Sequence, residues 1–341
     1  MSSLRTSFTR LRNYPGKVCL GLLGLLLVLA VLSICVGAVP VSPKAVVDAL
    51  LHGENASVSG RIVLYSRLPR TWGSVLAGAA LAVSGVIIQS VMANPLAAPH
   101  IIGVNSGAGF GAILCCAFFP TMVNMIPAAA FLGALAATLV VLLFAQRTGA
   151  SRITLVLAGV AISGLFSAGI DTIIMLVPDA LTGYTDFRVG GLNGVTMAKI
   201  LPAAVMIGIA MIAAFSMAPQ LDVLSLGSET AQSLGLSVRP VRLVLLILAA
   251  AMAGASVSFC GLIGFVGLIV PHVICSLVGE DSLPLMAASA LGGAILLTLC
   301  DLLARTVASP YEISVGIVLD YIGAPFFLWL LVHQRGERAR D

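Results

Sequence analysis

The stretch from Arg67 to Ile101 constrains the fold of this chain most. A short basic segment, residues 67–70, precedes an apolar run of about twenty residues; a proline-rich break follows at residues 94–99, and another apolar run begins at Ile101. An apolar run of this length crosses the hydrocarbon layer of a membrane as a helix. Irregular backbone at membrane depth survives only where protein or a water-filled cavity covers it. The order therefore predicts a polytopic membrane protein whose broken helices line a pathway.

Composition supports this class of fold. Hydrophobic residues make up 59% of the 341 residues and charged residues 9%, whereas an average soluble domain has about 25% charged residues. The length leaves room for about ten spans with short loops. We predict an all-α polytopic membrane protein of about ten transmembrane helices, a single transmembrane domain over residues 1–341. The expected spans are 18–39, 71–92, 101–119, 127–145, 153–177, 200–218, 242–260, 262–278, 284–304 and 315–333.

The basic residues predict how the chain is oriented. Residues 1–17 carry four basic side chains and no acidic one, and the loop 146–152 carries two arginines and no acid. By the positive-inside rule both segments are cytoplasmic, and ten spans then place both termini on the cytoplasmic side. The leader is not expected to be a cleaved signal peptide, because its apolar run is too long. Segments 40–66 and 178–199 fall outside, the second with a short surface helix.

The longest cytoplasmic segment is residues 219–241. Within it, residues 229–234 are expected to form a short amphipathic helix, and Gly235 is expected to end that helix as its C-terminal stop. The glycine row Gly103, Gly107 and Gly111 is typical of close helix packing in lipid rather than of phosphate binding.

Ionisable residues inside apolar spans are costly, and by default they are functional or paired. Asp301 and Arg305 are four residues apart and can pair on one helix. Asp171 and Asp320 have no partner nearby in sequence, so each either faces a wet pathway or pairs with an arginine of another helix. His272 follows Pro271, where a helix break is expected, and is either structural or in contact with substrate.

Arg67 and Arg70 flank Pro69 at the outer mouth of the second span. They either anchor the helix at the interface or dock an acidic external protein, because a rigid pair of guanidinium groups suits carboxylates.

Several catalytic signatures are missing from the sequence. It has no G-x-x-x-x-G-K-[ST], no H-E-x-x-H and no G-x-S-x-G motif, so ATP is not expected to bind this chain through a P-loop. We expect no enzyme activity, cofactor, metal site or nucleic-acid partner. An intramembrane enzyme would need a converging nucleophile and base or a metal constellation. A secondary transporter that uses Asp171 or Asp320 as its ion site is an alternative of another class.

Together the sequence motifs resemble those of the FecCD-type permeases, the membrane subunits of ABC importers for ferric siderophores, haem and vitamin B12. The stretches that carry the resemblance follow in order over most of the chain from residue 67 onward: Arg67-Leu68-Pro69-Arg70, 78–89, Asn94-Pro95-Leu96-Ala97, 103–107, 224–236, 261–272, 301–305, Val315-Gly316-Ile317 and Gly323-Ala324-Pro325-Phe326-Phe327.

The resemblance implies a type II ABC importer permease fold of ten helices. It also implies a dimer around one pathway, two cytoplasmic ATPase subunits, and an extracytoplasmic substrate-binding protein. Coupling to the ATPase is then expected at Leu224, Gly227, Glu229, Ala231, Leu234 and Gly235. Docking of the binding protein is expected at Arg67, Arg70 and Arg305. The implied location is the cytoplasmic (inner) membrane of a bacterium or archaeon.

Some positions depart from the family pattern. Val273-Ile274-Cys275 stands where an arginine is usual, Ser314 replaces a proline, and Asp320 takes a place usually filled by a small or apolar residue. We expect transport of an iron(III)–siderophore complex by alternating access through a dimer with a second, identical permease subunit. Haem and vitamin B12 remain the alternatives within the family. The residues expected at the pathway or its gate are Asn94, Pro95, Asp171, Gly267, Pro271, His272 and Asp320.

Overall fold

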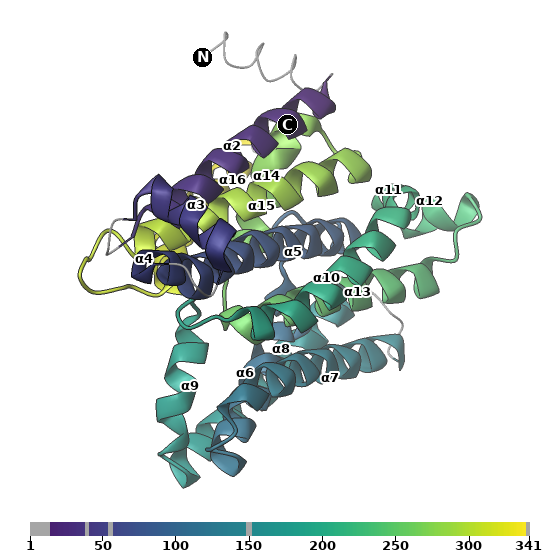
Figure 1. The fold of residues 1–341 in the computed structure, drawn as a ribbon. Coiled ribbons are helices and arrows are strands. Elements are labelled where there is room, and N and C mark those ends of the chain that lie inside the picture. The colour runs from purple at the N-terminus through teal and green to yellow at the C-terminus, as the bar shows by residue number, and fades with distance from the viewer. Residues whose placement is uncertain (1–13, 38–40, 54–56, 148–151, 339–341) are drawn as a thin grey trace.

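The computed structural model describes residues 14–37, 41–53, 57–147 and 152–338, and every regular element in these ranges is helical (Figure 1). Most of the basic leader 1–17 lies outside the described residues. Ten helices coincide with the ten predicted apolar runs and confirm the all-α prediction. They are α2 (Pro15–Cys35), α5 (Leu68–Met92), α6 (Val104–Phe118), α7 (Ile126–Arg147), α8 (Arg152–Leu176), α10 (Met197–Ser216), α13 (Val238–Cys260), α14 (Val266–Val278), α15 (Ser282–Ala304) and α16 (Val315–Arg338).

Seven of the described helices are long and apolar enough to cross a membrane, and α6, α14 and the apolar part of α16 are shorter. The 13 residues of α14 extend about 20 Å at 1.5 Å per residue, less than a hydrocarbon core of about 30 Å.

The prediction of a helix break at Pro271 is wrong, because Pro271 lies inside α14. The break lies earlier, between Gly261 and Phe265, whose φ angles of 71° and 62° end one helix before the next begins.

Smaller helices gather at the two ends of the long ones. The helices α3 (Pro43–His52), α4 (Val58–Ile62) and α9 (Ala180–Val189) lie at one end in Figure 1. The helices α11 (Ala218–Ser225) and α12 (Ser228–Ser233) lie at the opposite end. Helix α4 continues through a π-helical turn, Val63–Arg67, into α5, and 3-10 turns at Pro99–Ile102 and Val123–Met125 precede α6 and α7. The short helix expected in 178–199 is therefore present as α9.

Glycines let the central helices touch along their backbones. A Cβ atom added to Gly78 of α5 would collide with the carbonyl oxygen of Gly293 in α15, and a Cβ atom on Gly293 would collide with Gly78. Gly107 of α6 meets Gly133 of α7 in the same way, which confirms helix packing as the role of the glycine row. The contact between Gly78 and Gly293 is part of the packing that holds α5 and α15 side by side over their length. Helices α13 and α14 also pack on α5.

Candidate functional site

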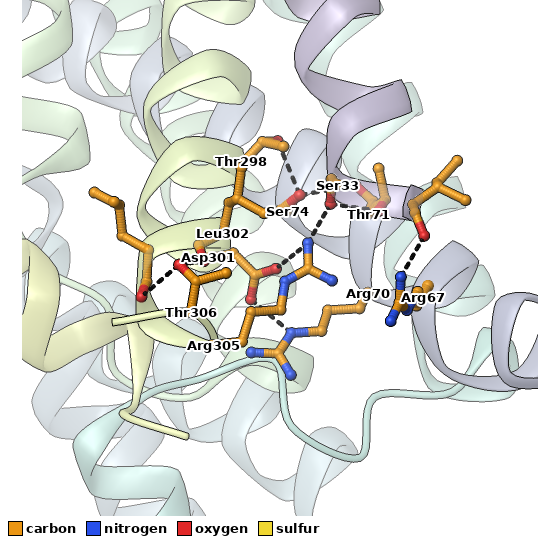
Figure 2. A network of polar contacts seen from close by, with 12 residues as sticks. Ser33, Arg67, Arg70, Thr71, Ser74, Thr298, Asp301, Leu302, Arg305 and Thr306 are labelled. Atoms are coloured by element: carbon orange, nitrogen blue, oxygen red, sulfur yellow. Dashed lines mark hydrogen bonds and ion pairs between the residues drawn. The ribbon is translucent and has the colours of Figure 1, made fainter. Parts of the chain in front are cut away.

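A buried ion cluster (Figure 2) lies where α5 begins and α15 ends, at the end of the molecule that holds α3 and α4 in Figure 1. The guanidinium group of Arg70 donates from Nε to Oδ1 of Asp301 and from Nη1 to Oε2 of Glu312, both at 2.7 Å. Arg305 Nη2 lies 3.4 Å from Oδ2 of the same aspartate. The Asp301 side chain has no exposed surface, whereas that of Glu312 is 34% exposed. A buried carboxylate thus lies between two arginines, and the second carboxylate completes the cluster from its edge.

Hydroxyl groups extend the ion cluster onto α2. Arg305 Nη2 donates to Oγ of Ser33 at 2.6 Å, and that hydroxyl is 2.8 Å from Oγ1 of Thr71 (Figure 2). Arg67 donates from Nη1 to the carbonyl oxygens of Ile34 and Cys35 at 2.8 Å and 2.7 Å, at the C-terminal end of α2. Cations are favourable at a helix C-terminus, because its last carbonyls have no partner within the helix. The three arginines therefore tie α2, α5 and α15 together.

The expected Asp301–Arg305 pair is present, but it is only part of the ion cluster. Arg70 joins from a position 231 residues away, and sequence spacing could not reveal this. The only sign of this pairing in the sequence was that Arg70 and Asp301 are charged residues in or beside apolar runs, where an unpaired charge is costly.

The three arginines expected at the docking surface point into the protein, because Arg67, Arg70 and Arg305 are only 5%, 7% and 3% exposed. Within the described residues, the ion pairs of the cluster join two arginines, Arg70 and Arg305, to two carboxylates, Asp301 and Glu312.

The expected coupling segment folds into α11 and α12. Helix α12 covers Ser228–Ser233, which confirms the predicted short helix within one residue at each end. Gly235 has a φ of 84° and donates to the carbonyl oxygen of Gln232 at 2.9 Å, so this left-handed glycine ends the helix as predicted. Gly227 precedes the helix with a φ of 105°. Both turns need backbone conformations that side chains disfavour.

The residues expected to couple to the ATPase face in two directions. Leu224 and Ala231 have no exposed surface, whereas Leu226 and Leu234 are each more than 60% exposed and Glu229 is also exposed. The buried pair fixes the segment to the helices, and the exposed side chains form a surface at the end of the molecule.

The residues expected at the pathway or its gate do not gather at one point. Asn94 and Pro95 are exposed in the turn after α5, where Oδ1 of Asn94 accepts from the Leu96 amide at 2.9 Å. Gly267 and Pro271 are buried, and a Cβ atom on Gly85 would collide with the Gly267 carbonyl. His272 is half-buried, with its ring edge-on to Phe326 at a centroid distance of 6.3 Å. Gly267 and Pro271 thus pack α14 against the helices beside it.

Asp171 and Asp320 are both exposed on the protomer. Asp171 lines a cavity of about 420 Å³ between α6, α8 and α9, whose polar side chains include Asn105, Ser106, Ser167, Tyr184 and Arg188. Asp320 lies on α16 beside Tyr321, which is 80% exposed. Carboxylates facing lipid would be expensive. The face of α8 that carries Asp171 and the face of α16 that carries Asp320 must therefore contact water or a second protein surface.

Comparison with known proteins identifies the family. The FecCD transport family model matches residues 25–333. The chain is 38% identical to the Fe(3+)-citrate import system permease protein YfmE of Bacillus subtilis, over 95% of this chain and 97% of that protein. It is 37% identical to the hemin transport system permease protein HmuU of Yersinia pestis, over 93% and 96%.

A solved structure described as a metal-chelate type ABC transporter in an inward-facing conformation superposes with a TM-score of 0.84. Its sequence is 31% identical, and the match covers 93% of this chain and 99% of that one. Sequence and fold therefore agree over nearly the whole length: the chain belongs to the FecCD transport family and is a multi-pass permease subunit of an ABC transporter.

Proposed function

We propose that the chain imports an iron(III) chelate of the siderophore type across the cytoplasmic (inner) membrane. The observation that carries the substrate class is the cavity beside Asp171. Six of its nine lining residues are polar, and their hydroxyl, amide, carboxylate and guanidinium groups suit a hydrophilic chelate. Relatives named for ferric citrate and for iron(3+)-hydroxamate import support it.

Haem is the second candidate, because HmuU is 37% identical. A large apolar ring would favour an apolar cavity, so the six polar residues among the nine that line this cavity favour the hydrophilic chelate over haem. The test is uptake into proteoliposomes that contain the assembled transporter and its binding protein. Ferric citrate, a ferric hydroxamate, hemin and cobalamin are offered separately. Uptake of hemin or cobalamin alone would contradict the proposed substrate.

The mechanism we propose is alternating access in a dimer of two permease subunits, with ATP hydrolysed on two separate partner subunits. The end with α11 and α12 then faces the cytoplasm together with both termini. The end with α3, α4 and α9 faces the binding protein outside. Preferential binding of ATP to one conformation shifts the dimer between its two states. Uptake that follows an imposed ion gradient without ATP would instead favour a secondary transporter that uses Asp171 or Asp320.

The proposed ATPase contact lies on the exposed side chains Leu226, Glu229 and Leu234. Replacing Leu226 and Leu234 together with Asp places two charges in an apolar contact, so the ATPase is expected to be lost on co-purification. Ser237→Asp is the control, because it adds charge at an exposed site beside α12. A substitution of the buried Ala231 would be a poorer test, since it would disturb α12 itself. Normal co-purification of the double variant would contradict this contact.

The proposed docking face for the binding protein is the end that holds the ion cluster. Since its arginines are buried, their positive charge would steer an acidic partner without touching it. Glu312→Gln removes one negative charge from the partly exposed edge of the ion cluster, so this end becomes more positive. It should therefore speed association with the binding protein at low salt and steepen its salt dependence. An unchanged association rate across salt concentrations would leave the three arginines with an internal role only.

A further inference from the structure

Asp222 connects the proposed ATPase-facing segment to a helix 60 residues further along the chain. Its Oδ1 accepts a hydrogen bond from the backbone amide of Ser282 at 2.8 Å. Ser282 is the first residue of α15 and is buried. The preceding Asp281 makes no side-chain cap bond. A carboxylate from α11 therefore satisfies one of the free amides at the start of α15, where a negative charge is favoured.

Helix α11 is seated firmly on the helices around it. Leu221 and Leu224, on either side of Asp222, have no exposed surface. At the other end of the segment, Arg242 of α13 donates from Nη2 to Oγ of Ser228 at 2.9 Å. Movement of α11 relative to α15 must therefore disturb buried leucines or break the Asp222–Ser282 bond.

Helix α15 is in turn fixed to α5 at successive levels. The backbones touch at Gly293 and Gly78, Thr298 Oγ1 lies 2.9 Å from Ser74 Oγ, and Asp301 accepts from Arg70 at 2.7 Å. Ser282 and Asp301 are 19 residues apart, about 28 Å along a helix. The helix pair α5–α15 thus reaches from α11 to the ion cluster at the far end (Figures 1 and 2).

We propose that Asp222 is a positioning residue that transmits movement of α11 and α12 to the α5–α15 pair through the amide of Ser282. The proposal rests on the proposed function, because it takes α11 and α12 as the segment that the ATPase moves. Without the bond the ATPase still docks and hydrolyses ATP, but α15 no longer follows α11 closely, so less substrate crosses for each ATP.

Two substitutions remove the bond from opposite sides. Asp222→Ala removes the acceptor. Ser282→Pro removes the donor, while proline is well suited to the first position of a helix. The preceding residue, Asp281, has φ −59° and ψ 124°, which a following proline tolerates. Asp222→Asn keeps an acceptor oxygen, and Asp281→Ala removes a neighbouring carboxylate that makes no cap bond.

The measurement is substrate transported per ATP hydrolysed in proteoliposomes, together with basal ATPase activity and co-purification of the ATPase. We expect Asp222→Ala and Ser282→Pro each to lower the ratio by about fivefold to tenfold, the lower end of the range that common coupling free energies give. Basal ATPase activity and assembly should stay unchanged. Because both variants remove one bond, the double variant should be no worse than either single variant. Asp222→Asn and Asp281→Ala should resemble the parent.

An unchanged ratio in Asp222→Ala would overturn the proposal. Loss of assembly in both bond-deleting variants would also overturn it, because the contact would then only stabilise the fold. ATP-independent transport by the parent would contradict the proposed function and, with it, this inference. ATP-driven parent transport with an unaffected Asp222→Ala variant would contradict this inference alone.

Discussion

Arg70 holds two carboxylates at the same distance but in different surroundings. Asp301 is fully buried and Glu312 is about one third exposed. Removing one partner of a buried ion pair costs about 3–5 kcal/mol, whereas an exposed pair contributes about 1 kcal/mol or less. Asp301→Ala should therefore lower the thermal unfolding temperature of the purified protein far more than Glu312→Ala. Equal shifts in the two variants would show that burial does not set the energetics of this ion cluster.

Asp48 gives a pH-dependent contact outside the membrane-spanning helices. Its Oδ2 accepts from the backbone amide of Ser57 at 2.9 Å, and its Oδ1 lies 2.9 Å from the ring Nδ1 of His52. The Ser57 bond, followed by His52, holds the pKa of Asp48 below its ordinary value of 3.8.

Because the pKa of Asp48 is lower in the folded state, its contact stabilises the link between α3 and α4 above the unfolded-state pKa. That stabilisation is lost as the pH falls through the folded-state pKa. The Ser57 amide should lose protection from hydrogen exchange in that range, after correction for intrinsic rates, and Asp48→Asn should remove the dependence. Protection that persists under strong acid in the parent would exclude this role.

At the scale of helices, the contact between α5 and α15 depends on the absence of side chains at Gly78 and Gly293. Gly78→Ala places a Cβ atom against backbone, and overpacking of this kind costs about 1–3 kcal/mol. Gly208→Ala in α10 is the matched control, because its Cβ atom would meet nothing within 4 Å. Alanine is favoured over glycine in a helix by about 1 kcal/mol, so the two variants should shift the thermal unfolding temperature in opposite directions. A shared direction would contradict the proposed helix contact.

Local features of the elements were predictable from the sequence, and their distant contacts were not. Apolar runs located ten helices, and Gly235 marked the end of α12, because each depends on residues close in sequence. The start of α14 was misplaced by four residues, because Phe265 adopts a left-handed conformation that no local signal favours. The bonds Arg70–Asp301 and Asp222–Ser282 join residues 231 and 60 positions apart. Such pairings depend on the packed arrangement of whole helices.

At the scale of the whole molecule, we propose that the exposed carboxylates Asp171 and Asp320 face a pathway shared by two subunits. A cysteine at position 320 should react with a water-soluble thiol reagent in a background that lacks the seven native cysteines. A cysteine at Ile209 is the control, because this exposed apolar residue lies mid-way along α10, where lipid should shield it. Asp320→Asn should leave folding intact and alter uptake or its pH profile. An inert cysteine at 320 with unchanged uptake in the Asn variant would remove Asp320 from the pathway.

The distance in sequence between Arg70 and Asp301 has a consequence for how the protein is made. At about 5–20 residues per second, the ribosome needs roughly ten to fifty seconds to extend the chain by the 231 positions from Arg70 to Asp301. During that interval Arg70 has entered or approached the bilayer without its buried counter-ion. The nascent α5 must then keep the guanidinium group near the headgroups, where a long side chain can reach water. If synthesis stops before residue 301, the unfinished chain keeps Arg70 in the membrane without its counter-ion. We expect membrane proteases to recognise this unpaired charge as a sign of an incomplete chain.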